Sequence, residues 1–257
     1  MTPRMHLYIL ASGSKGNAAV VEGPEGSVLV DCGLSRRELH RRATLVGCDL
    51  DRVCAVLVTH EHSDHTKGLS VICKHFDGPV YATAGTANSR ASMQRLPLTH
   101  VTHDCTLTLG GMRICAFPLS HDVMDPMCFR FEVVEQGAVV DAIGWITDTG
   151  VLTEQAKNAL RGCRIVGIEA NHDLDMLTNG PYPSYLKARV AGRNGHLSNT
   201  QAVEALPSLI TRETQVVVAM HISENNNTPQ LVKHALKSAL SGSATLYLAS
   251  QSEPLAL

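Results

Sequence analysis

The chain has 257 residues, of which 44% are hydrophobic and 18% are charged, so we expect a globular, soluble protein. This length suits one large α/β domain with a sizeable core. The formal net charge of −2 excludes a global basic field, and a nucleic-acid ligand would therefore need a local basic patch or bound metal ions.

Cysteine usage and hydropathy indicate the compartment. None of the eight cysteines forms a CxxC pair, and most lie in apolar stretches, which favours buried thiols over a disulfide framework. No charged-then-apolar leader is visible, and no apolar run approaches 18 residues. We therefore expect a cytoplasmic protein that makes no membrane contact.

The first half of the chain predicts short strands mixed with helices. Apolar runs bounded by turn signals predict strands over 6–10, 18–22, 27–30, 53–58 and 79–82. Helices are expected over 36–46, 66–76 and 85–95. The first of these is framed by Ser35 as its N-cap and by Gly47 after its last turn.

The second half begins with hairpins and continues with helix–strand alternation. We expect strands over 106–109, 112–117, 129–134, 139–146, 165–169, 215–220 and 245–248. Helices are expected over 153–160, 183–190, 199–210 and 229–238. The order of elements predicts an α/β fold in which two mixed sheets pack face to face with helices outside. Because no linker interrupts the pattern, we expect a single domain over residues 1–257.

The densest chemistry lies at residues 60–65, with the sequence HEHSDH, directly after the apolar run 53–59. Neutral imidazole binds zinc, iron or manganese, and a carboxylate adds a hard oxygen ligand. His60 and His62 can aim at one ion, and Asp64 and His65 can aim at a second ion beside it. A metal site is favoured over a structural role, because these groups buried without a metal would leave polar atoms unpaired.

Three further ligand-type residues follow predicted strands: His121, Asp148 and His221. Strand ends are rigid and can hold ligands in fixed geometry. Each residue alone is also explained as a turn or a cap. Together they complement the 60–65 cluster in number and in chemical type.

These residues, taken in order, resemble the signature of the metallo-β-lactamase superfamily. Shorter stretches resemble its YycJ/WalJ-like branch, at 12–17, 31–35, 120–122, 169–173, 195–199 and 221–223. The resemblance implies an αββα sandwich with metal ions at one edge of the sheets, and DNA exonuclease-type phosphodiesterase activity. It also implies one ion held by His60, His62 and His121, a second held by Asp64, His65 and His221, and Asp148 as the bridge between them.

Two divalent ions (zinc, manganese or iron) would explain catalysis. Ions about 3.5–4 Å apart lower the pKa of a bridging water, which supplies a hydroxide for attack on a phosphodiester. Asp64 is expected to orient that water or take its proton. His196 is the first candidate for protonating the leaving group and His172 the second, with Glu169 or Asp173 as a carboxylate that holds a histidine tautomer. For His196, a place beside the cap of the next helix is the alternative.

Two other features could contact nucleic acid. The turn 12–17 is rich in glycine and small donors, so its backbone N–H groups could face a phosphate. We take Ser14, Lys15 and Asn17 as substrate-binding candidates, with a plain hairpin turn as the alternative. The helix over 36–46 carries a basic face, which is either solvated or a contact for a nucleic-acid backbone: Arg36, Arg37, Arg41 and Arg42.

The leading hypothesis is a di-metal phosphodiesterase that trims nucleotides from a DNA end. The same ligands could also hydrolyse a small ester, thioester, lactone or cyclic phosphodiester, so the ligands alone do not decide between these substrates. A non-catalytic metal-binding protein is a third class. The seven predicted ligands argue against it, because a purely structural site needs no open position for water.

Overall fold

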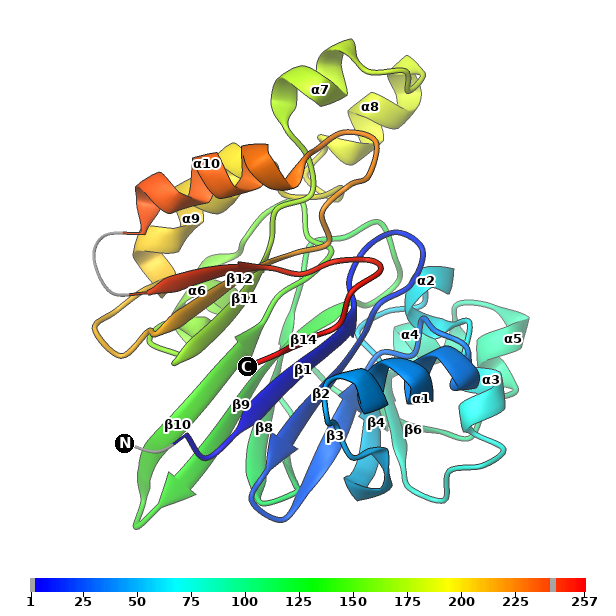
Figure 1. The fold of residues 1–257 in the computed structure, drawn as a ribbon. Helices are drawn as coiled ribbons and strands as arrows, with labels where there is room; N and C mark the ends of the chain where they lie inside the picture. The colour runs from blue at the N-terminus through cyan, green and yellow to red at the C-terminus, as the bar shows by residue number, and fades with distance from the viewer. Residues whose placement is uncertain (1–2, 241–243) are drawn as a thin grey trace.

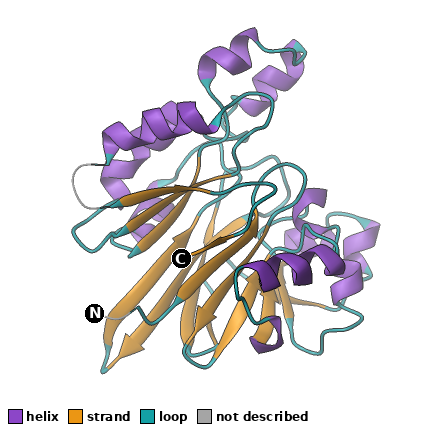
Figure 2. Ribbon diagram, in the orientation of Figure 1, coloured by secondary structure: helices purple, strands orange, loops and turns teal. Residues whose placement is uncertain are grey.

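The computed structural model describes residues 3–240 and 244–257. Within them, two mixed sheets of seven strands each pack together and carry helices on their outer faces (Figures 1 and 2). The strand orders are β14-β1-β2-β3-β4-β5-β6 and β13-β12-β11-β10-β9-β8-β7. The predicted α/β class and the face-to-face sheets are confirmed.

The first sheet is antiparallel on one side and parallel on the other. Its strands are β1 (His6–Ala11), β2 (Ala18–Gly23), β3 (Gly26–Val30), β4 (Val53–Leu57), β5 (Val80–Thr83), β6 (Leu98–Val101) and β14 (Leu255–Ala256). Strands β14, β1, β2 and β3 pair antiparallel, and β3 to β6 pair parallel. The loops after β3 and β4 therefore leave the sheet at the same edge.

The second sheet repeats this arrangement. Its strands are β7 (Thr106–Leu109), β8 (Met112–Pro118), β9 (Met127–Glu135), β10 (Ala138–Trp145), β11 (Ile165–Glu169), β12 (Val216–Met220) and β13 (Thr245–Leu248). Strands β7 to β10 form antiparallel hairpins, and β10 to β13 are parallel. The loops after β10, β11 and β12 consequently share one edge.

Helices cover the outer face of each sheet. Beside the first sheet lie α1 (Arg36–Leu45), the 3-10 turn η1 (Leu50–Arg52), α2 (Ser63–Thr66), α3 (Leu69–Ile72), α4 (Ala84–Asn88) and α5 (Ala91–Gln94). Beside the second lie α6 (Glu154–Leu160), α9 (Asn199–Leu209) and α10 (Pro229–Ala239). The short helices α7 (Leu174–Asn179) and α8 (Ser184–Val190) project at the top of Figure 1.

The core has three layers. The central layer lies between the two sheets and includes Leu57, Phe129, Phe131 and Met220. Two outer layers pack the helices onto the sheets. Burying one large apolar side chain contributes about 1.5–3 kcal/mol, so the packed sheets form a rigid base for the loops at their shared edge.

Two predicted helices are each broken into two. In place of the helix expected over 66–76, α2 ends at Thr66 and α3 spans Leu69–Ile72, with Gly68 between them; the Gly68 N–H donates to Cys32 O at 2.8 Å. A Cβ at this position would lie 2.1 Å from Leu34 O, so the chain needs glycine there. The helix expected over 85–95 divides at Arg90, which has an extended φ of −157°. Strands β6 and β14 and helix α7 were not predicted, because they are short and lack a clear apolar period.

All eight cysteines are free, as predicted, but four of them are not buried: Cys73, Cys105 and Cys115 are half-buried and Cys54 is exposed. Across residues 3–240 and 244–257, we find no helix whose length and apolar character would let it cross a bilayer.

Candidate metal centre

The seven predicted ligands converge at one edge of the sandwich, where loops from both sheets meet below α7 and α8 (Figure 1). The loop after β4 carries two of them, helix α2 directly after it carries two more, and the loops after β8, β10 and β12 carry one each. In chain order they are His60, His62, Asp64, His65, His121, Asp148 and His221.

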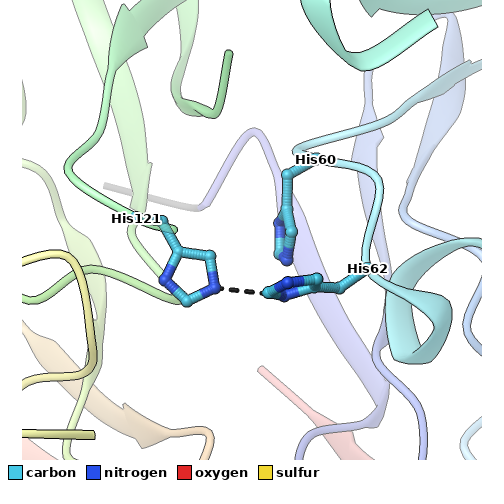
Figure 3. A group of neighbouring side chains, drawn as sticks. All are labelled: His60, His62 and His121. Atoms are coloured by element: carbon cyan, nitrogen blue, oxygen red, sulfur yellow. Dashed lines mark hydrogen bonds between the residues drawn. The ribbon is translucent and has the colours of Figure 1, made fainter. Parts of the chain in front are cut away.

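The first group consists of His60, His62 and His121, with ligand atoms that all lie within 4.8 Å of one another. Figure 3 shows the three rings facing one another from two loops. His62 Nδ1 lies 3.2 Å from His121 Nε2. Two nitrogens on a tetrahedral zinc ion, with bonds of 2.0–2.1 Å, would be about 3.3 Å apart. The spacing therefore fits one ion.

Tautomers and charge support this assignment. His121 Nδ1 lies 3.1 Å from the carbonyl oxygen of Gly195, to which it can donate, and this leaves Nε2 as a free lone pair. Burial lowers the pKa of His62 and His121, and burial together with the neighbouring His65 lowers the pKa of His60 well below its usual value. The three rings are therefore neutral at physiological pH, and neutral imidazole is the form that binds metal.

The second group consists of Asp64, His65 and His221. Asp64 Oδ2 lies 3.5 Å from His65 Nε2 and 3.7 Å from His221 Nε2. Asp148 Oδ2 lies 2.7 Å from His65 Nε2 and 3.9 Å from His60 Nε2. The carboxylate of Asp148 thus stands between the two groups, at the position that a bridging ligand requires.

Two buried nitrogens at the centre test whether these residues fit metal ions. His60 Nε2 and His221 Nε2 are buried and have no hydrogen-bond partner among the residues that the structure describes. Buried polar atoms are almost always satisfied in native proteins. Both atoms face the groups described above, so the donor set fits divalent cations.

Asp31, which the sequence analysis did not select, supports the second group. Its carboxylate accepts from Thr59 N and Thr59 Oγ1, both at 2.8 Å, and lies 2.7 Å from His65 Nδ1. A carboxylate behind a histidine fixes the ring and leaves Nε2 for a metal. Asp31 follows β3 directly, so the strand-end pattern that selected Asp148 would also have selected it.

Glu169 plays the equivalent part for His221, as the sequence suggested. The fully buried carboxylate accepts from Thr149 N at 2.9 Å and Leu197 N at 3.2 Å. Its Oε1 lies 3.0 Å from His221 Nδ1 and 2.8 Å from His196 Nδ1. Asp173, the other suggested partner, instead caps α7.

In the second group, neighbouring carboxylates raise the pKa values of the histidines, whereas the pKa values in the first group are lowered. Burial acts to lower the pKa of His65, but Asp31 and Asp148 outweigh it and raise that pKa to about 10. The pKa of His221 is likewise raised well above its usual value, because Asp148 and neighbouring carboxylates outweigh burial. An environment that stabilises a proton on these rings also favours a divalent cation beside them.

Three strand-end residues of the centre have left-handed backbone conformations. The φ angles are 59° for Asp31, 54° for Asp148 and 52° for His221. Such angles cost about 1–3 kcal/mol for a residue other than glycine, and they cluster at functional sites. The surrounding contacts therefore offset this backbone strain and keep the three side chains directed toward the centre.

A pocket of about 270 Å³ opens beside the centre. The metal-facing side is formed by His62, Asp64, Asp148 and His221. His196 and Ser14 also line the pocket, and other parts of the lining come from α8 and the segment before it: Tyr182, Leu186, Arg189 and Val190.

The structure separates the two predicted proton donors. His196 lines the pocket, and burial is outweighed by Glu169 and Asp148, which raise its pKa to about 9. His172 is fully buried away from the pocket lining, and burial lowers its pKa to about 4. His196 therefore stays in the candidate site, and the sequence-based role of His172 as a proton donor is not retained.

The turn 12–17 differs from its prediction as a phosphate cradle. Its N–H groups have internal partners: Gly13 donates to Asn17 Oδ1, Lys15 to Gln251 Oε1, and Asn17 to Asp64 O. The Lys15 ammonium pairs with Glu224 at 2.5 Å.

The buried amide of Asn17 lies 3.2 Å from Asp64 Oδ2 and 2.9 Å from His65 Nε2. Of the three predicted residues, Ser14 reaches the pocket, and Asn17 instead contacts two candidate ligands, Asp64 and His65.

The basic face of α1 is partly structural. Arg41 and Arg42 both pair with Glu38, and Arg42 also donates to Leu10 O and Gln251 O. Arg36 and Arg37 are exposed. The helix therefore offers fewer free cations to a nucleic acid than its sequence suggested.

Comparison with known proteins identifies the family. Residues 27–222 match the model of the beta-lactamase superfamily domain. The chain belongs to the metallo-β-lactamase superfamily. It is 34% identical to the exodeoxyribonuclease YycJ of Bacillus anthracis, over 92% of this chain and 89% of that protein. It is 31% identical to the exodeoxyribonuclease WalJ of Streptococcus pneumoniae, over 87% of this chain and 83% of that protein.

Solved structures show the same superfamily fold. The metallo-beta-lactamase fold protein YhfI from Bacillus subtilis superposes with a TM-score of 0.72 at 14% identity, covering 98% of this chain and 99% of that chain. Zn(2+)-bound PqqB from Methylobacterium extorquens superposes with a TM-score of 0.69 at 15% identity, covering 97% and 99%. The predicted superfamily and αββα sandwich are confirmed, and the chain is a metal-dependent hydrolase with a divalent metal site.

Proposed function

We propose that this hydrolase is a di-metal phosphodiesterase that removes nucleotides from DNA ends. The observation that carries the proposal is the arrangement of seven donor side chains in two adjacent groups, with Asp148 between them. The DNA substrate is supported by the two relatives named as exodeoxyribonucleases, which align over most of their length. Zinc, manganese and iron all suit this donor set.

Two bound ions would lower the pKa of an attacking water and would offset charge on the phosphate oxygens in the transition state. The residues of the chain orient the reactants. Asp64 lines the pocket with its side chain 20% exposed, so it can accept a proton from the attacking water. The Asn17 amide donates to Asp64 Oδ2 and fixes the direction of that carboxylate.

His196 is proposed to protonate the leaving alkoxide. Glu169 stands behind the ring at 2.8 Å and holds a proton on Nδ1. The ring lines the pocket next to the metal-facing side chains, with its centroid 5.1 Å from those of His121 and His221. A general acid in such a position contributes about 10²–10⁴ to the rate.

End-labelled DNA tests the proposal. Metal-loaded protein is incubated with single-stranded and double-stranded DNA, with and without chelator, beside the Asp64→Ala variant. We expect metal-dependent release of nucleotides from an end, and loss of that release in Asp64→Ala while the fold is kept. Turnover of a small ester, thioester, lactone or cyclic phosphodiester without DNA degradation would favour the alternative substrate class. Activity that survives Asp64→Ala would contradict the mechanism.

A further inference from the structure

Helix α8 supplies one arginine to the lining of the pocket beside the metal centre. Among the residues that line the pocket, Arg189 is the one lysine or arginine. The carboxylates of Asp64, Asp122 and Asp148 also line this pocket. Arg189 is therefore the side chain of permanent positive charge in this lining that can pair with a second negative charge on a bound substrate.

The helix α8 presents this arginine within an apolar surface. Leu186, Arg189 and Val190 all line the pocket, and their i, i+3, i+4 spacing places them on one face of the helix. Tyr182 lies just before the helix, and its hydroxyl accepts a hydrogen bond from Asn225 Nδ2 at 3.1 Å, which fixes the ring. The wall thus combines a held aromatic ring, two aliphatic side chains and one guanidinium group.

Arg189 lies close to the centre and still has free donors. Its Nε donates to the carboxylate of Asp122. The other oxygen of Asp122 lies 3.5 Å from His121 Nε2 and 3.7 Å from His62 Nε2. One carboxylate therefore separates the guanidinium from the first metal group. With a side chain that is 56% exposed and five N–H groups in total, Arg189 can bind an anion without leaving Asp122.

We propose that Arg189 binds the phosphate adjacent to the scissile one, and that Tyr182 and Leu186 contact the nucleoside between the two phosphates. This inference rests on the proposed function. A volume of about 270 Å³ lies at the small end of ligand pockets, which suits a single nucleotide. The scissile phosphate faces the metal centre, and the planar fork of arginine matches the oxygens of its neighbour.

Equilibrium binding to the metal-loaded protein tests this assignment without requiring turnover. Titration calorimetry compares thymidine 3′,5′-bisphosphate with the 3′- and 5′-monophosphates. We expect the wild type to bind the bisphosphate about tenfold more tightly than either monophosphate, as one charged hydrogen-bonded contact provides. Arg189→Ala should abolish the preference, and Arg189→Lys should keep part of it.

Lys187→Ala is the matched control. Lys187 lies on the same helix and outside the pocket, and its ammonium donates to Thr178 O at 2.7 Å, tying α8 to α7. Like Arg189→Ala, Lys187→Ala removes one positive charge from α8, and it also removes a contact between helices. It should nevertheless keep the full preference for the bisphosphate over the monophosphates. Equal melting temperatures and metal contents across the variants would exclude an effect through folding or metal loading.

The outcomes separate this inference from the proposed function. A wild type without preference for the bisphosphate, or an Arg189→Ala variant that keeps the preference, would overturn the assignment whatever the protein does to DNA. A lost preference in both Arg189→Ala and Lys187→Ala would also overturn it. If the wild type degrades no DNA but Arg189→Ala alone loses the preference, the exonuclease proposal fails and the role of Arg189 stands.

Discussion

At the scale of single residues, the candidate ligands depend on carboxylates that lie behind them. Asp31 fixes His65, and Glu169 fixes His221 and His196. A hydrogen-bonded carboxylate sets the tautomer of a histidine and increases its basicity as a ligand. The affinity of the centre for metal should therefore be sensitive to residues that do not touch the ions.

Asp31→Asn should weaken metal binding about 10–100-fold, the usual effect of removing such a partner. The amide cannot accept from both groups of Thr59 and also hold a proton on His65 Nδ1. Titration against a competing chelator measures the change. Asp104→Asn, at an exposed turn, serves as the control. An unchanged metal affinity in Asp31→Asn would show that the Asp31 carboxylate does not support metal binding.

His196→Ala should reduce the hydrolysis of an oligonucleotide about 100-fold or more, because the leaving alkoxide then lacks its proton donor. The same variant should lose much less on bis(p-nitrophenyl) phosphate, whose leaving group departs without protonation. The ratio of kcat/KM values for the two substrates is the measurement. An equal loss on both would contradict the role of His196 as a general acid.

Residues with a local signal in the sequence, either a dense cluster of ligand types or a position at a strand end, were the ones that could be predicted. The 60–65 cluster, and ligand types at strand ends, were sufficient to select all seven side chains that the structure brings together. Arg189 stands alone in the sequence, so its importance becomes visible only through contacts that the fold creates. Asp31 follows a strand directly, as Asp148 does, and the same pattern could have selected it. Asn17 was predicted to contact the substrate because it lies in a glycine-rich turn. In the structure its amide instead contacts the side chains of Asp64 and His65.

At the scale of elements, three loops from different parts of the first sheet interlock beside the centre. Cys32 N donates to His65 O, Gly33 N donates to Asn17 O, and Asn17 N donates to Asp64 O. A Cβ at Gly33 would lie 1.6 Å from Asp64 O, so the backbones approach as closely as glycine permits. This contact holds the backbone at Asp64 in place.

Gly33→Ala should therefore displace the loop that carries Asp64, destabilise the fold by about 1–3 kcal/mol and weaken metal binding. Gly137→Ala is the control. Gly137 has φ +80° in the β9–β10 hairpin with no atom within 4 Å of an added Cβ, so that variant should lose stability and keep its metal affinity. Thermal unfolding and metal titration measure the two effects. Equal metal affinity in both variants would show that the contact does not position Asp64.

Element prediction succeeded where local signals were strong. β11 matches its predicted bounds, and α1 and α9 start at the residues after their serine caps. It failed where tertiary contact decides the outcome. The division of a helix at Gly68 depends on the approach of Cys32 and Leu34, which are more than 30 positions away in the chain.

At the scale of the whole molecule, the two sheets are built on one plan and share one core. The central core combines β1 to β4 with β8 to β12, and the metal centre takes ligands from loops of both sheets. We propose on this basis that residues 1–257 fold as a single domain. Neither sheet can bury its inner face without the other.

Metal removal should accordingly destabilise the whole chain in one step. At a free metal concentration of 100 times Kd, each ion that binds only the folded state adds about 2.7 kcal/mol, so two independent ions add about 5.4 kcal/mol. For a chain of this size, chelation of both ions should lower Tm by about 10–20 °C and leave a single transition. Circular dichroism in the near and far ultraviolet, recorded with and without chelator, tests this. Two separate transitions would contradict the single domain.

The central claim is that two divalent ions are held side by side by seven side chains. Anomalous diffraction from a crystal of metal-loaded protein tests it most directly. We expect two peaks about 3.5–4 Å apart, one among His60, His62 and His121 and the other among Asp64, His65 and His221, with Asp148 between them. A single peak, or peaks away from these residues, would contradict it.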